Sequence, residues 1–144
     1  MAITQALPNS FKKQLLDGDQ DFSSAGGDKF KLALYVSTAT LGAATTSYTT
    51  SGEVSSSGTN YTTGGKALVN SGTSVVSTVA FTDFADLSFA NVTLTARGCL
   101  IYNTSFSNSA VAVLNFGADK TATSGTFTIQ FPAFTSSAAI IRIS

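Results

Sequence analysis

Apolar and polar residues alternate with a period of two along most of this chain, which is the pattern of half-buried β-strands. The clearest case is 29–35, where every second residue is large and apolar. Further strand signals follow at 66–70, 74–81, 91–96, 99–102, 111–116, 125–131 and 138–143. Strands spaced by about 8–12 residues, with no helix-length segments between them, are typical of a β-sandwich or barrel. The sequence therefore predicts one all-β domain over 28–144, an antiparallel sandwich or jelly-roll-like barrel.

A short helix is predicted at about 10–17, within an N-terminal segment that covers 1–27. The side-chain oxygens of Asn9 and Ser10 can accept hydrogen bonds from free backbone N–H groups and so cap the helix start. Gly18 suits the helix end, because glycine adopts the left-handed conformation easily.

One face of this helix carries Phe11, Leu15 and Leu16. Two helical turns are marginally stable alone, so the helix has to pack either on its own sheet or on a neighbouring protein. We predict protein–protein contacts at these three residues and also at Phe22 and Arg97. Because Arg97 lies between two strands, it either pairs with Asp86 or Asp119 or marks a subunit contact.

The segment 37–65 is rich in Ser, Thr and Gly, and Glu53 is its single charged residue. This composition predicts an exposed excursion with short strands near Tyr48 and Tyr61. Long loops in compact domains are often interaction segments.

The chain carries few charged residues and no net charge, and this composition argues against some classes of function. Charged residues make up 11% of the chain, against about 25% in average soluble domains, and eight Lys and Arg offset eight Asp and Glu. Nucleic-acid binding requires clustered Lys and Arg, so none is predicted. No apolar run is long enough to span a membrane, and no secretion signal is recognisable, so we expect synthesis in a cytoplasm.

Residues that carry enzyme chemistry are also scarce. The chain has no His, which rules out a Ser-His-Asp triad and histidine metal ligands. Asp17, Asp19 and Asp21 are spaced as in a calcium loop, but Phe22 stands where that loop needs Gly and Asp28 where it needs Glu. The sequence thus predicts no catalytic residue, no metal and no cofactor, and a protein that is not an enzyme.

The single cysteine, Cys99, cannot form an intrachain disulfide. It lies in an apolar run, so we predict a small buried hydrophobic side chain.

Several stretches together resemble a group of small virion proteins of tailed bacteriophages. They are MAITQA at 1–6, SFK at 10–12, FKLALY at 30–35, ARGCLIYN at 96–103, AVAVLNFG at 110–117, SGTFTIQFP at 124–132 and AIIRI at 139–143. The similarity covers nearly the whole chain and carries no catalytic residues.

This resemblance implies a virion structural protein that is located in the particle after synthesis in the host cytoplasm. The first hypothesis is a capsid decoration, or cement, protein whose partners are the major capsid protein and further copies of itself. It would be a homo-oligomer or be bound to the capsid lattice. The alternative is a tail or fibre component that recognises the host surface.

Overall fold

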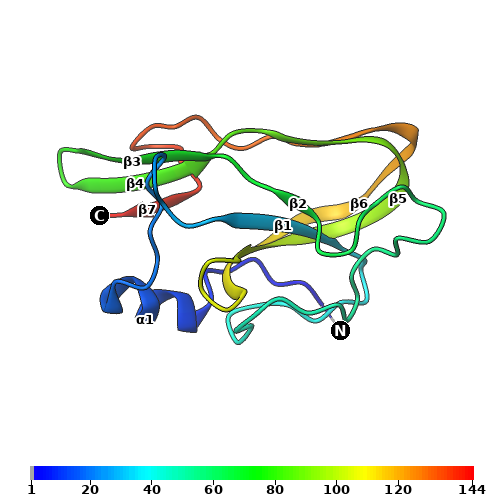
Figure 1. The fold of residues 1–144 in the computed structure, drawn as a ribbon, viewed down its shortest axis with the longest axis horizontal. Helices are drawn as coiled ribbons and strands as arrows, with labels where there is room; N and C mark the ends of the chain where they lie inside the picture. Colours follow the sequence, from blue (N-terminus) through cyan, green and yellow to red (C-terminus); the bar gives the residue numbers. More distant parts are fainter. Residues whose placement is uncertain (1) are drawn as a thin grey trace.

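One helix and seven strands follow one another along residues 2–144, the part of the chain that this computed structural model describes (Figure 1). They are α1 (Asn9–Asp17), β1 (Phe30–Tyr35), β2 (Lys66–Ala67), β3 (Asn70–Val76), β4 (Val79–Phe84), β5 (Leu87–Asn103), β6 (Ser109–Ile129) and β7 (Ile141–Ile143). They form two antiparallel sheets with strand orders β2-β1-β5-β6 and β3-β4-β7. The predicted all-β fold with a short N-terminal helix is therefore confirmed.

The hairpin of β5 and β6 is long and bends back over itself (Figure 1). The pairing shows where it bends, because Ala96 faces Lys120 whereas Gly98 faces Asn115. Arg97 alone thus opposes the four residues 116–119, and such bulges bend a strand and increase its twist. The bend lets one pair of strands contribute to two packed layers. The strands predicted at 91–96 and 99–102 are consequently two parts of β5, and those at 111–116 and 125–131 are two parts of β6.

The strand predicted at 74–81 is in fact a tight hairpin of β3 and β4. Val76 pairs directly with Val79, which leaves Ser77 and Thr78 as a two-residue loop. Ser77 has φ = 54°, a left-handed conformation that two-residue hairpin loops require and that Gly or Asn adopts more readily. The sequence prediction failed here because neither loop residue is the Gly or Asn that two-residue hairpin loops favour.

Helix α1 packs on its own sheet through aromatic rings. Phe11 is fully buried, and its ring lies edge-on to that of Phe22, with 6.0 Å between centroids. Phe22 stacks in turn on Phe30 of β1 at 4.7 Å. Residues of the predicted N-terminal segment therefore belong to the same core as the sheets, and Ile3 is buried as well.

The two ends of α1 differ in how they are capped. Gly18 ends the helix in the left-handed conformation, with φ = 78°, as predicted. At the start, Pro8 occupies the cap position and no side chain caps the helix. The capping role predicted for Asn9 and Ser10 is wrong, because Asn9 is already helical and the buried Ser10 hydroxyl has no hydrogen-bond partner.

The chain's four tyrosines hold the segment 37–65 against the sheet. The carboxylate of Glu53 accepts hydrogen bonds from the Tyr48 hydroxyl at 2.6 Å and from the Tyr61 hydroxyl at 2.8 Å. The Tyr61 oxygen also accepts the backbone N–H of Leu34 in β1 at 2.9 Å. Burial, opposed by that Leu34 bond and reinforced by Glu53, raises the pKa of Tyr61 above its usual range.

The other two tyrosines reach the segment from the sheet. Tyr35 donates to the carbonyl of Thr49, and Tyr102 donates to the carbonyl of Gly64, each at 2.6 Å. Burial, together with the charge of Glu53, raises the pKa of Tyr102 to about 12. The short strands predicted near Tyr48 and Tyr61 are absent from the strands found in residues 2–144. Isolated bridges at Ser47 and Glu53 and the tyrosine hydrogen bonds hold the segment instead.

Removing the Tyr61 hydroxyl should destabilise the fold. In Tyr61→Phe, the backbone N–H of Leu34 and one oxygen of Glu53 lose a partner, which costs about 1–3 kcal/mol when the groups are buried. We expect a lower urea midpoint with an unchanged m-value. Tyr48→Phe is the matched control, because the half-buried Tyr48 makes one such bond and its loss should cost less. Equal midpoints for Tyr61→Phe and the wild type would contradict this role.

The carboxylate of Asp83 in β4 is buried, and few hydrogen bonds offset its loss of hydration. Its side chain has no exposure to solvent, and while Oδ1 accepts the N–H of Phe84 at 2.9 Å, Oδ2 makes no hydrogen bond of normal geometry. Burial is the main cause that raises the pKa of Asp83 above its usual range. The folded state therefore disfavours the charged form.

We expect Asp83→Asn to stabilise the protein at neutral pH by about 1 kcal/mol, because it removes an ionised group from the interior. The gain should shrink as the pH falls through the raised pKa, since Asp83 then becomes protonated in the folded state. Urea unfolding of both proteins between neutral and acidic pH measures the difference. A gain that grows on acidification would show that the carboxylate is stabilising.

Candidate interaction surface

Large apolar side chains are exposed at one end of the molecule. Among residues 2–144 they are Leu16, Val69, Val75, Val76, Phe134 and Ile143, which we call the apolar end. They lie on or next to α1 and the β3-β4-β7 sheet, which share the left side of Figure 1. Single exposed apolar residues are ordinary on protein surfaces, whereas exposed apolar residues that lie side by side are typical of a contact surface.

Two of these residues, Val75 and Ile143, form a row across the small sheet together with the exposed Ala80. Val75 of β3 pairs with Ala80 of β4, and Ala80 pairs with Ile143 of β7. Directly paired residues point to the same face of a sheet. Because Val75 is 65% exposed and Ile143 is 55% exposed, this row presents apolar surface to solvent.

A groove of about 260 Å³ lies between this sheet and the segment that follows α1. Its lining includes Leu15 and Phe22 on one side and Ile141 and Ile143 on the other. The row on the sheet thus continues into a hollow that is also largely apolar.

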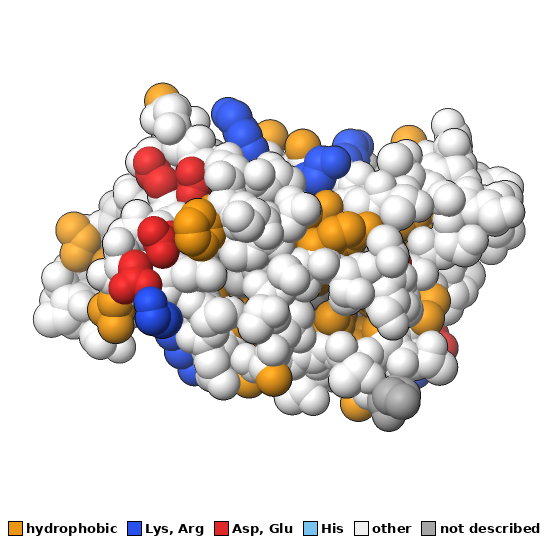
Figure 2. All heavy atoms as spheres, turned by 60° about the horizontal axis from the view of Figure 1, so that its bottom comes forward, with side chains coloured by type: hydrophobic (Ala, Val, Ile, Leu, Met, Phe, Trp, Pro, Cys, Tyr) orange, Lys and Arg blue, Asp and Glu red, His pale blue; other side chains and the backbone are white. Residues whose placement is uncertain are grey.

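Few charges interrupt this surface. In the small sheet, β3 and β4 carry only the buried Asp83, and β7 carries the exposed Arg142. Figure 2 shows that most of the visible face is uncharged and that most of its acidic side chains gather on the left, the side on which α1 and the small sheet lie in Figure 1, so the apolar end borders an acidic patch. Apolar surface loses little hydration free energy when a partner covers it, whereas charged surface loses much.

The acidic turn after α1 shows no metal site. Within residues 2–144, no three His, Cys, Asp or Glu residues come close enough to hold a metal ion. Lys13 pairs with Asp17, and the carboxylate of Asp21 accepts the Ser23 hydroxyl at 2.6 Å. That hydrogen bond is the main cause that lowers the pKa of Asp21.

The structure separates the five predicted contact residues. Phe11 and Phe22 are buried, which leaves no side-chain surface for a partner at Phe11 and little at Phe22. Leu15 is half-buried in the groove, whereas Leu16 is 91% exposed and belongs to the apolar end. Contact with a partner at these positions stays a prediction.

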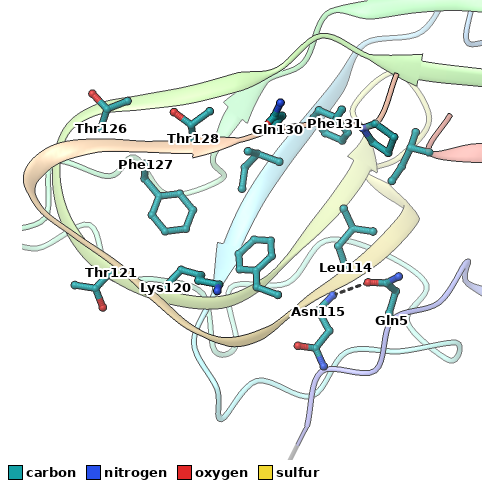
Figure 3. Close-up of a pocket in the computed structure, with 14 residues that line it drawn as sticks. Gln5, Leu114, Asn115, Lys120, Thr121, Thr126, Phe127, Thr128, Gln130 and Phe131 are labelled. Atoms are coloured by element: carbon teal, nitrogen blue, oxygen red, sulfur yellow. Dashed lines mark hydrogen bonds between the residues drawn. The ribbon is translucent and has the colours of Figure 1, made fainter. Parts of the chain in front are cut away.

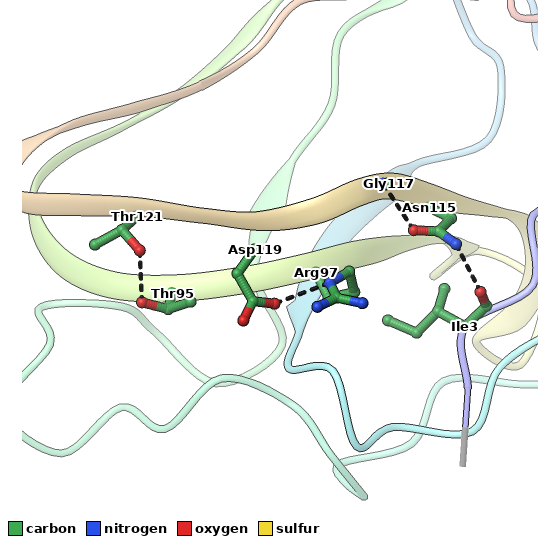
Figure 4. A network of polar contacts seen from close by, with 7 residues as sticks. All are labelled: Ile3, Thr95, Arg97, Asn115, Gly117, Asp119 and Thr121. Atoms are coloured by element: carbon green, nitrogen blue, oxygen red, sulfur yellow. Dashed lines mark hydrogen bonds and ion pairs between the residues drawn. The ribbon is translucent and has the colours of Figure 1, made fainter.

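Arg97 lies elsewhere, at the bend of the β5–β6 hairpin (Figure 4). Its Nε donates to Oδ1 of Asp119 at 2.9 Å, which decides between the two acids that the sequence left open. The other acid, Asp86, instead accepts the backbone N–H of Phe131 at 2.8 Å. The ion pair spans the bulge, so Arg97 has a local partner for its charge.

Sequence reasoning missed Val75, Val76 and Ile143. It assigned the two valines to one continuous strand and Ile143 to a strand locked into the sheet. The available signal was the polar pair Ser77-Thr78 between two valine-containing stretches, which marks a hairpin with an apolar tip.

The rest of the described chain offers little reactive chemistry. Cys99 is fully buried, and burial raises the pKa of its thiol. No helix formed by residues 2–144 has the length and apolar character needed to cross a membrane. Comparisons of the chain with protein-family models, curated proteins and solved structures found no match.

Because Leu16 makes little contact within the fold, Leu16→Ala should change the free energy of unfolding by less than about 0.5 kcal/mol. Phe22→Ala is the contrasting variant, and it should cost about 3–5 kcal/mol because it opens a cavity among stacked rings. Thermal unfolding of both variants tests this. A large loss of stability in Leu16→Ala would show that this leucine serves the fold of the monomer.

Proposed function

We propose that this protein is a structural component of a tailed-phage virion, in which it decorates the capsid and joins neighbouring subunits of the major capsid protein. The observation that carries the proposal is the apolar end, and within it the exposed row of Val75, Ala80 and Ile143 that continues into the groove. In a free monomer such exposed apolar surface promotes aggregation, whereas in an assembly a neighbouring subunit covers it.

Other features support the same role. The chain has few charges and no His, and its described residues hold no cluster suited to metal chemistry. Its sequence resembles small tailed-phage virion proteins along nearly its whole length. A decoration protein acts by mass action, because each interface it buries shifts the equilibrium toward the assembled shell.

The test uses capsids of the phage that encodes the chain, prepared without this protein. We expect the wild-type protein to co-sediment with these shells, and the double variant Val75→Lys, Ile143→Lys to bind at least about tenfold more weakly. Two unpaired charges in a desolvated contact cost several kcal/mol. Ser56→Lys, at an exposed position of the 37–65 segment, is the matched control and should bind normally.

Copy number per virion, measured by quantitative mass spectrometry, completes the experiment. Hundreds of copies fit capsid decoration, and a handful fit the tail or fibre alternative. Absence of the protein from purified virions would refute both. Normal binding of the double variant would refute the assignment of the contact to the apolar end.

A further inference from the structure

A slot of about 600 Å³ opens at the β6 edge of the larger sheet (Figure 3). The chain passes it twice, with residues 114–121 on one side and residues 126–132 on the other. Between these two stretches the pairing with β5 is irregular, because Leu94 faces Ala122 whereas Val92 faces Gly125. The slot therefore lies between two parts of the same folded hairpin.

The register of β5 and β6 decides which side chains point into the slot, because directly paired residues point to the same face of a sheet. Phe127 pairs with the buried Phe89. Ile129 pairs in the same way with the buried Leu87. Figure 3 accordingly shows Phe127 pointing into the space and Thr128 pointing away from it.

The opposite side of the slot is apolar as well. Leu114 and Phe116 are half-buried there and pack against the same core cluster as Phe127. The rings of Phe116 and Phe127 approach each other with 6.2 Å between centroids. The interior of the slot is thus walled by aromatic and aliphatic side chains from both stretches.

Polar side chains of the lining make contacts within the fold. The hydroxyl of Thr128 hydrogen-bonds to that of Ser88 at 3.1 Å, and the hydroxyl of Thr121 hydrogen-bonds to that of Thr95 at 2.8 Å. Asn115 donates to a backbone carbonyl of the N-terminal segment at 2.9 Å. These three polar side chains border the slot and already have partners.

Lys120 is the single charged residue of the lining. It pairs with Ala96, whose side chain is fully buried, so the lysine leaves the strand on the inner face of the hairpin. Within residues 2–144 neither salt bridge includes Lys120, and the neighbouring Asp119 is bonded to Arg97. The slot consequently combines an apolar interior with one ammonium group and no opposing acid.

An inward-pointing lysine has two simpler roles. It protects an exposed sheet edge from pairing, and its aliphatic stem covers apolar surface while the ammonium group stays in water. Neither role requires a hollow beside the lysine. A hollow of about 300–1,000 Å³ with apolar walls and few polar groups is typical of a site for a small molecule.

We propose that the slot binds a free single-chain aliphatic carboxylate, whose chain contacts Phe127 and Ile129 and whose carboxylate pairs with Lys120. A hydrocarbon chain suits these walls, because the polar groups of a sugar or a peptide would lose their hydration there without gaining partners. The unpaired ammonium group selects an anionic head. The proposal goes beyond capsid decoration and does not depend on it.

The experiment titrates the full chain with decanoate by isothermal titration calorimetry, below the concentration at which decanoate forms micelles. We expect saturable binding of one decanoate per chain. Isotope-filtered NMR on the wild-type protein should show contacts between the decanoate chain and the side chains of Phe127 and Ile129. Contacts at the groove beside Leu15, or no saturable binding, would overturn the proposal.

A charge reversal tests the role of the lysine. Lys120→Glu should bind decanoate at least about tenfold more weakly, because it places like charges together, and should bind decyltrimethylammonium more tightly than the wild type does. Lys12→Glu makes the same change at an exposed position of α1 and should bind decanoate normally. Equal decanoate binding by Lys120→Glu and the wild type would overturn the pairing with Lys120.

Vesicles of phosphatidylglycerol distinguish a free carboxylate from a membrane surface. We expect the protein not to co-sediment with them, because their chains are held in the bilayer and the slot is a recess at a sheet edge. Co-sedimentation would identify the membrane surface as the ligand and overturn the proposal. These outcomes do not depend on the result of the capsid experiment.

Discussion

Packing between the two parts of one bent hairpin is the interaction on which the structure depends. Val92 and Leu94 precede the bulge at Arg97, Cys99 and Ile101 follow it, and all four apolar side chains belong to the same core. Full burial of an aliphatic side chain of this size contributes about 1.5–3 kcal/mol. The bulge is needed because the two parts of a straight hairpin could not pack against each other. β1 then pairs with the second part of β5, and the rings of Phe22 and Phe30 connect α1 to this sheet.

Sequence periodicity predicted the fold class because the buried positions alternate within each straight stretch. It could not join the stretches correctly. Gly117 in the bulge segment 116–119 resembles a turn residue although the strand continues through it, whereas Ser77-Thr78 contains no Gly or Asn although the chain reverses there. The helix was found through Gly18 and its apolar face, but the burial of Phe11 depends on Phe22, a contact that local pattern does not contain. The set of predicted contact residues was incomplete for the same reason, because the exposure of a side chain also depends on contacts that local pattern does not contain.

Hydroxyl groups form many of the stabilising polar contacts for which most domains use ion pairs. The tyrosines hold the 37–65 segment, and Thr95 and Thr121 hydrogen-bond across the hairpin at 2.8 Å (Figure 4). Only two salt bridges occur among residues 2–144, and both are at least partly exposed. Salt screens exposed charges strongly but affects buried or partly buried hydrogen bonds much less. The fold and its apolar contacts should accordingly vary little with ionic strength.

The position of Cys99 gives the chain a built-in reporter. It is the single thiol, it is completely buried, and it lies in the strand that pairs with both β1 and β6. A thiol-specific reagent can reach the sulfur only when these neighbours separate from β5. The rate of labelling under native conditions therefore counts opening events of the central sheet, without any engineered probe.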